Sequence, residues 1–173
     1  MAKYFKVLFD DKGVFGVAHT VEKRDLFMLP YAGIVEDWQP MTLELRQGAF
    51  ADYLASNLGC RLCSDRLRNI LQSHSAPEDH LQWLAVEVRR GSQNRTYSIL
   101  HFPNPPEVLN KDRSIFAGDF VVKPVLSRDA IGCHRVFSYP KSGELRMFIA
   151  EPVKRAIEAA GCTGMELSPA PVQ

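Results

Sequence analysis

The sequence lacks any long apolar segment, and its first residues lack the pattern of a secretion signal. The longest apolar run, residues 26–35, contains Pro30 and Gly33 and is shorter than the roughly 18 residues that a membrane-spanning helix requires. Lys6 and Asp10 stand where a signal peptide would continue as an apolar stretch. We therefore expect a cytoplasmic protein without membrane association.

An excess of charge of either sign is also missing, because 21 basic and 20 acidic residues leave a net charge of +1. Proteins that bind nucleic acid usually concentrate positive charge, since neutralising phosphates supplies much of their affinity. The balance argues against a nucleic-acid partner. A local patch is still open, because Arg89, Arg90 and Arg95 surround an expected hairpin turn near Tyr97. An RNA-binding module built on these arginines is therefore an alternative.

The common catalytic motifs are absent from the sequence. It contains no Gly-x-Ser-x-Gly elbow, no phosphate-binding loop and no His-Glu-x-x-His motif. Cys133 and His134 are adjacent, but neighbouring residues of a strand point to opposite sides, so they are poorly placed to act as nucleophile and base. We expect no enzymatic activity, no catalytic residue and no cofactor.

The four cysteines are expected to be reduced thiols. Cys60-x-x-Cys63, followed by His74 and His80, superficially resembles a zinc finger. The gap between Cys63 and His74 is short, however, and Pro77 separates the two histidines. The expected helix also begins after the second cysteine, whereas a redox pair places the first cysteine there. We predict no metal site, and a metal- or thiol-dependent enzyme using the Cys60/Cys63 region is the alternative.

The sequence does contain the patterning of one α+β domain over residues 1–173, with a hydrophobic fraction of 46%. Residues 1–58 are less regular, residues 60–167 form the core and residues 168–173 form a tail. We expect a mainly antiparallel sheet with hairpins, on which two or three short amphipathic helices pack. Alternation and turn residues predict strands over residues 4–9, 14–17, 41–45, 81–88, 95–102, 120–126, 135–139, 145–149 and 165–167. Turn residues predict that 4–9 pairs with 14–17, 81–88 with 95–102 and 135–139 with 145–149 as hairpins. Helical spacing predicts helices over residues 50–58, 64–72 and 152–160.

One local pattern occurs twice, in residues 62–71 and 148–157. Each copy has a strand end, a small residue, an acid and an amphipathic helix. These segments, with the hairpin around Tyr97, the strand at Val136-Phe137 and Gly161-x-x-Gly164, resemble immunity-protein family eleven of bacterial polymorphic toxin systems, formerly a domain of unknown function. The resemblance covers residues 60–167, although Ala150 stands where a serine cap is usual. Its motifs are structural and transfer no catalytic residue.

The resemblance implies a protein that binds a cognate protein encoded nearby and neutralises or stabilises it. The partner would be a toxin domain or a repeat protein such as an ankyrin array, and a homo-oligomer is also compatible with the sequence. Recognition is often carried by ordered loops, so residues 19–40 are the first place to look for the contact surface. Tyr31, Trp38 and Trp83 are the candidate partner-binding residues.

Overall fold

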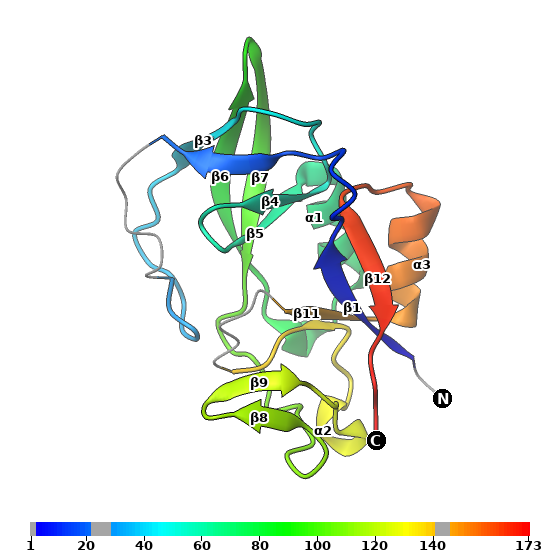
Figure 1. The fold of residues 1–173 in the computed structure, drawn as a ribbon. Helices are drawn as coiled ribbons and strands as arrows, with labels where there is room; N and C mark the ends of the chain where they lie inside the picture. Colours follow the sequence, from blue (N-terminus) through cyan, green and yellow to red (C-terminus); the bar gives the residue numbers. More distant parts are fainter. Residues whose placement is uncertain (1–2, 22–28, 141–145) are drawn as a thin grey trace.

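The computed structural model describes residues 3–21, 29–140 and 146–173, and it confirms a mixed α+β protein (Figure 1). Its largest unit is a closed six-stranded barrel. The barrel strands, in spatial order, are β2 (Val17–Thr20), β3 (Met41–Leu45), β6 (Gln82–Arg90), β7 (Gln93–His101), β5 (Arg61–Ser64) and β4 (Tyr53–Ser56). Two of the pairings, β2 with β4 and β3 with β6, are parallel, and the others are antiparallel.

A four-stranded antiparallel sheet and a separate hairpin complete the strands. The sheet has the order β10 (Val136–Phe137), β11 (Met147–Ala150), β1 (Tyr4–Phe9) and β12 (Met165–Pro169). The hairpin consists of β8 (Ile115–Ala117) and β9 (Phe120–Lys123) and lies below the barrel in Figure 1. In the described residues the helices are α1 (Asp65–His74), α2 (Arg128–Ile131), α3 (Glu151–Ala159) and the one-turn 3₁₀ helix η2 (Pro77–Asp79). Within the described residues, every helix is too short or too polar to cross a bilayer.

The barrel encloses the first hydrophobic core. Alternation along β6 turns Leu84, Val86 and Val88 inward, and β3 contributes Leu43 and Leu45 in the same way. All five side chains are buried. The alternating apolar residues of these two strands therefore form part of the inside of the barrel.

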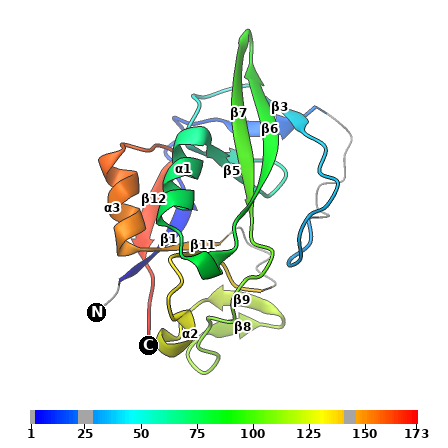
Figure 2. The same cartoon turned by 180° about the vertical axis from the view of Figure 1, so that it is seen from behind.

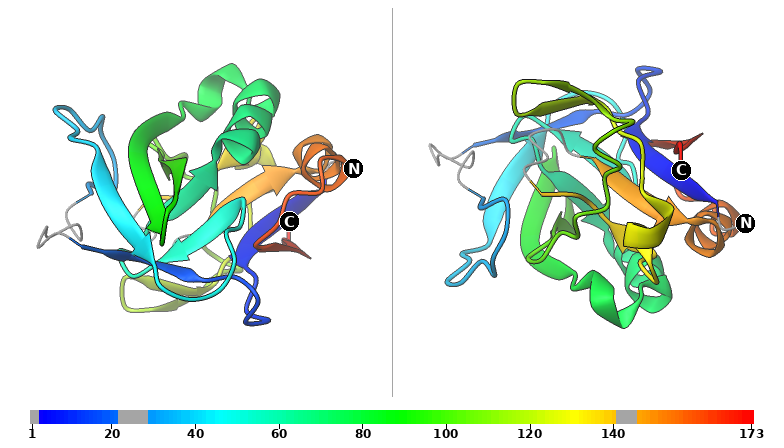
Figure 3. Two further views of the ribbon diagram at one scale, coloured as in Figure 1. Left: turned by 90° about the horizontal axis from the view of Figure 1, so that it is seen from above. Right: turned by 90° about the horizontal axis from the view of Figure 1, so that it is seen from below.

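A second core lies between the barrel, the four-stranded sheet and the helices α1 and α3. Leu67 and Leu71 of α1 and Val153 and Ile157 of α3 are buried there. The two helices lie side by side in Figure 2, and in the view from above both lie on the same side of the barrel (Figure 3). The repeated strand–acid–helix pattern thus corresponds to β5–α1 and β11–α3, which pack their apolar faces into one core.

The two copies of this unit begin their helices differently. Ser64 caps α1, since its Oγ accepts a hydrogen bond of 3.2 Å from the backbone N–H of Leu67. Ala150 offers no such oxygen, but Pro152 occupies the first turn of α3, where its missing N–H leaves no donor unsatisfied. Both helix starts agree with the sequence prediction.

The predicted helix over residues 50–58 is wrong, because this segment contains strand β4. Tyr53 is buried in the second core, whereas Leu54 is buried inside the barrel. A strand that is covered on both faces shows no polar alternation, so its apolar residues can imitate helical spacing. Gly59, which follows this segment, has a φ of +62° in the turn between β4 and β5.

The predicted hairpin between residues 4–9 and 14–17 is also wrong. Strand β1 lies between β11 and β12, while the chain after it crosses to the barrel. At the crossing, the N–H of Gly16 donates to the Ala49 carbonyl at 3.0 Å. Only glycine fits at this position, because a Cβ would lie 2.0 Å from the backbone oxygen of Gln47.

The chain end, predicted as a tail, continues the sheet. The N–H of Ala170 donates to the Tyr4 carbonyl at 2.8 Å, and that of Gln173 donates to Leu126 at 2.9 Å. Strand β8 and helix α2 were not predicted, and the strand expected over residues 120–126 ends at Lys123.

Candidate protein-interaction surface

The three aromatic residues proposed from the sequence have different surroundings. Trp38 packs against the barrel core and donates from Nε1 to the Ala85 carbonyl at 2.9 Å. Trp83 packs against the second core, and its Nε1 donates to Gln72 at 2.7 Å. Tyr31 is 65% exposed. Tyr31 is therefore presented to solvent, whereas both indoles are partly built into the fold.

Residues 29–40 form an ordered loop that is attached to β6 and β7. The amide of Gln82 bonds both the N–H and the carbonyl of Val35, at 2.9 and 2.8 Å. His101 donates from Nε2 to the Gly33 carbonyl at 2.7 Å, and burial lowers the pKa of this imidazole. The loop presents Tyr31 and Ile34, which is 70% exposed. Residues 22–28 of the predicted recognition segment lie outside the described residues.

The β8–β9 hairpin carries the other concentration of exposed apolar side chains. Ile115, Phe116, Phe120 and Val122 are 53%, 42%, 67% and 56% exposed. Large apolar side chains that gather on a surface commonly mark a site of protein contact. Sequence reasoning missed this surface, although the continuous apolar run from Phe120 to Val122 offers no polar face to solvent.

The base of the hairpin is firmly attached to the rest of the fold. Ser114 accepts a hydrogen bond from the Val125 N–H and donates to the Val125 carbonyl, at 3.0 and 3.2 Å. Val121 packs on the third hydrophobic core, which includes Leu126, Phe137 and Phe148. Gly118, with a φ of +59°, lies in the two-residue turn at the other end. The exposed apolar residues therefore stand on an ordered support.

A cavity of about 440 Å³ lies between this hairpin and the four-stranded sheet. Its volume is within the range of sites that hold small groups or single side chains. Tyr4, Lys6 and Leu8 share one face of β1; Tyr4 is covered by the third core, whereas Lys6 and Leu8 line the cavity. The lining residues are Lys6, Val7, Leu8, Phe9, Val122, Lys123, Pro124, Arg146, Met147 and Pro171. Three of these residues are basic and none is acidic.

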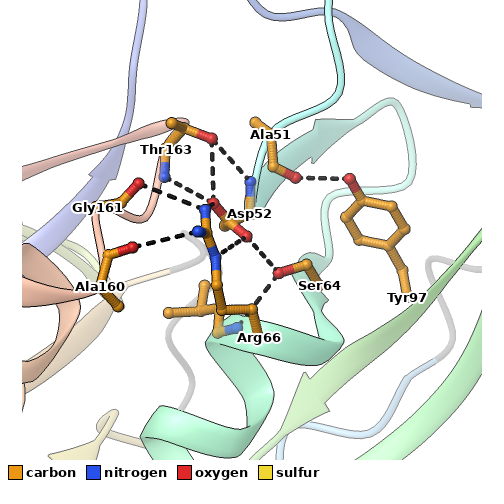
Figure 4. A network of polar contacts seen from close by, with 9 residues as sticks. Ala51, Asp52, Ser64, Arg66, Tyr97, Ala160, Gly161 and Thr163 are labelled. Atoms are coloured by element: carbon orange, nitrogen blue, oxygen red, sulfur yellow. Dashed lines mark hydrogen bonds and ion pairs between the residues drawn. The ribbon is translucent and has the colours of Figure 1, made fainter.

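Asp52 is the centre of a polar network that joins β4 to α1 and α3 (Figure 4). Its carboxylate accepts from Ser64 Oγ at 2.7 Å, from Arg66 Nε at 3.1 Å and from the Thr163 N–H at 2.9 Å. Arg66 also donates to two carbonyls at the end of α3. Burial alone would raise the pKa of Asp52, but the hydrogen bonds from Arg66, Ser64 and Thr163 outweigh it and lower the pKa to about 2. A carboxylate held in this way stabilises the fold and is poorly suited to transfer protons.

Asp79 is the second buried carboxylate with several donors. It accepts from the N–H groups of Ala76 and Val136 and from His134 Nδ1, at 2.7, 2.9 and 2.9 Å. The neighbouring Cys133 is exposed, and a hydrogen bond with Glu78 raises the pKa of its thiol. The structure therefore directs His134 toward Asp79 and favours the neutral thiol of Cys133, which is unlike an activated cysteine nucleophile.

Cys60 and Cys63 belong to different hydrophobic cores. Cys60 lies inside the barrel and Cys63 lies in the core under the helices, and burial raises the pKa of both thiols. His74 bonds the Ile70 carbonyl through Nδ1 at the end of α1, while His80 occupies a left-handed turn after η2. In the part of the chain that the structure describes, no three His, Cys, Asp or Glu residues form a group suited to metal binding.

The three arginines of the β6–β7 hairpin do not form one uniform patch. Arg89 pairs with Glu87 at 3.1 Å, and the guanidinium of Arg95 lies 4.3 Å from the centre of the Phe50 ring. Arg90 is exposed near the tip. Two of the three charges thus interact with side chains of this protein.

No family model matches this chain, and no curated protein is found to be similar to it. The resemblance to immunity-protein family eleven therefore stays a prediction. The β8–β9 hairpin and the loop over residues 29–40 are the two candidate contact surfaces that the geometry defines.

Proposed function

We propose that this protein is a non-catalytic binding module of the immunity type, which binds a cognate protein encoded nearby and neutralises or stabilises it. The observation that carries the proposal is the exposed apolar surface of β8–β9, formed by Ile115, Phe116, Phe120 and Val122. We call these four residues the hairpin face; Phe116, the least exposed of them, lies on the other side of the hairpin from Phe120. Burial of such side chains against a partner supplies most of the binding free energy in many protein complexes.

The hairpin face is a better candidate than the loop over residues 29–40 for two reasons. Its support is a pair of strands that are hydrogen-bonded to each other and that Val121 anchors on the third core. A pre-ordered surface loses less conformational entropy on binding than a surface that must be ordered. Val122 of the hairpin face also lines the adjacent cavity, which offers a recess for a partner side chain.

The alternation of the strands favours a partner that covers the outer side of the hairpin. Ala117 pairs with Phe120, so both residues face the same side, opposite to Phe116 and Val121. Val121 is turned toward the third core, which leaves Ala117 and Phe120 on the outer side. The register is irregular between Ile115 and Phe116, which limits continuous pairing with another strand. Side-chain contact is therefore the mode of binding that we propose.

Co-expression with the product of the adjacent gene tests the proposal. We expect the two proteins to elute together in size-exclusion chromatography, and the pair Phe120→Ser and Val122→Ser to abolish this co-elution. Val14→Ser is the matched control, since Val14 is 60% exposed and lies in the turn region after β1. Separate elution with the unmodified protein would contradict the proposal, and so would a complex that is unaffected by the hairpin substitutions.

A further inference from the structure

The cavity beside the hairpin face is a cationic recess with an apolar lining. Lys6 enters it from β1, Lys123 from β9 and Arg146 from the segment before β11. Among the described residues that line it none is acidic, although the whole chain is almost neutral, with a net charge of +1. The excess of positive charge is therefore a local property of this site.

Neither lysine of the cavity forms an ion pair with a described carboxylate of this protein. Lys154 pairs with Glu158 and Arg66 pairs with Asp52, whereas the ion pairs among the described residues include neither Lys6 nor Lys123. Arg146 donates to the Val122 carbonyl, which joins the cavity wall to the hairpin. The two lysines consequently remain available to a negatively charged group that enters from outside.

The apolar part of the lining indicates what such a group must be attached to. Leu8 lines the side of the sheet, and Val122 and Pro124 line the side of the hairpin, whereas the side chains of Phe9 and Met147 are turned into the second core. A carboxylate on a short aliphatic stem matches both the apolar and the cationic part of the lining. Its stem contacts the apolar residues, and its oxygens approach the ammonium groups of the lysines. A highly charged phosphate would leave this apolar surface without a partner.

We propose that the cavity accepts an acidic side chain of the partner protein, and that the docking segment of the partner combines carboxylates with aromatic or aliphatic residues. This inference rests on the proposed function, because it assumes that the segment also covers the hairpin face. Val122 belongs to both the hairpin face and the cavity lining, so one segment can reach both. Opposite charge at the cavity then selects the partner, while apolar contact supplies affinity.

A fluorescently labelled peptide, Gly-Phe-Asp-Phe-Asp-Gly with blocked ends, is the probe for this proposal. Its binding to the full chain is measured by anisotropy, beside versions in which Lys replaces Asp or Ser replaces Phe. We expect the acidic apolar peptide to bind, and both other peptides to bind at least about tenfold more weakly. The pair Lys6→Gln and Lys123→Gln should weaken binding of the first peptide by about tenfold. Arg90→Gln, which removes an exposed charge at the β6–β7 tip, should change it less than about twofold.

Four outcomes would overturn this inference. They are no binding of the acidic apolar peptide at millimolar concentration, equal binding of the lysine peptide, equal binding of the serine peptide, and self-association of the protein that the lysine substitutions abolish. The serine result would indicate a general carboxylate site, and self-association would identify a second copy as the occupant. The complex with the co-expressed partner separates this inference from the proposed function. If Phe120→Ser with Val122→Ser abolishes the complex but the lysine pair does not, the proposed function stands and the charge inference is contradicted. If neither pair affects the complex, both proposals fail.

Discussion

Replacing Asp52 with asparagine tests whether the polar network between β4, α1 and α3 stabilises the fold. Asparagine retains the size of the side chain but removes the negative charge that Arg66 approaches. It also replaces one acceptor oxygen by an NH₂ donor, which faces Ser64, Arg66 or the Thr163 N–H, all of which donate to Asp52. The substitution therefore weakens the network without opening a large cavity.

The magnitude follows from the pKa of Asp52, which is lowered from 3.8 to about 2 in the folded protein. Because each tenfold change in acidity corresponds to about 1.4 kcal/mol, the ionised carboxylate contributes roughly 2 kcal/mol of stability at neutral pH. The folded protein holds its proton less tightly than the unfolded chain does. This contribution is therefore complete above about pH 4, the unfolded pKa, and is lost as the pH falls toward 2.

Urea denaturation at a series of pH values measures this effect. At pH 7 we expect Asp52→Asn to lower the free energy of unfolding by about 2 kcal/mol or more, and we expect the difference from the unmodified protein to shrink below pH 4. The control is Glu44→Gln, which removes an exposed partner of Arg46 and should cost less than about 0.5 kcal/mol. A cost for Asp52→Asn that is equally small, or that does not change with pH, would refute this reasoning.

Two further predictions concern single buried or exposed groups. Tyr97 donates to the Ala51 carbonyl at 2.6 Å inside the protein, so Tyr97→Phe should cost about 1–2 kcal/mol in urea denaturation, and a cost near zero would mean that the carbonyl finds another donor. Among the thiols, exposed Cys133 should react with iodoacetamide in the native protein, with a rate that still rises above pH 9 because its pKa is raised. Cys60 and Cys63 should be alkylated only after unfolding, and mass spectrometry of the native protein would contradict the structure if it found them modified early.

Local sequence patterns predict much of the secondary structure. The bounds expected for β1 and β3 agree with the structure, and the hairpins β6–β7 and β10–β11 are present where turn residues separate alternating segments. Helices α1 and α3 begin at the cap and proline that the sequence offers. In β1, β3 and β6 one face is more buried than the other, and the starts of α1 and α3 are marked by specific residues, so the information is local.

Closure of the barrel is not visible in such patterns. It depends on the parallel pairing of β3 with β6, where Met41 lies opposite Val86. It also depends on β2 meeting β4. Parallel neighbours require a long connection, and which strands become neighbours is decided by packing across the whole domain. The misassigned segment around Tyr53 and Leu54 has the same cause, since only barrel closure places a core on both of its sides.

The three aromatic residues proposed from the sequence differ in exposure. Tyr31 is exposed, but the indoles of Trp38 and Trp83 find hydrogen-bond acceptors within the protein. The sequence cannot distinguish these cases, because exposure depends on residues that are distant along the chain. Phe120 and Val122 were read as part of an ordinary strand for the same reason, and only the structure leaves them uncovered.

The most direct test compares the two candidate surfaces in one affinity measurement with the co-expressed partner. Phe120 and Val122, which are 67% and 56% exposed, are replaced by serine in one variant, and Tyr31 and Ile34, which are 65% and 70% exposed, in the other. Loss of two apolar contacts of this kind costs about 2 kcal/mol or more, so the hairpin variant should bind at least roughly 30-fold more weakly. The loop variant should bind like the unmodified protein. Weaker binding by the loop variant alone, or equal affinity of all three proteins, would contradict the assignment of the hairpin face.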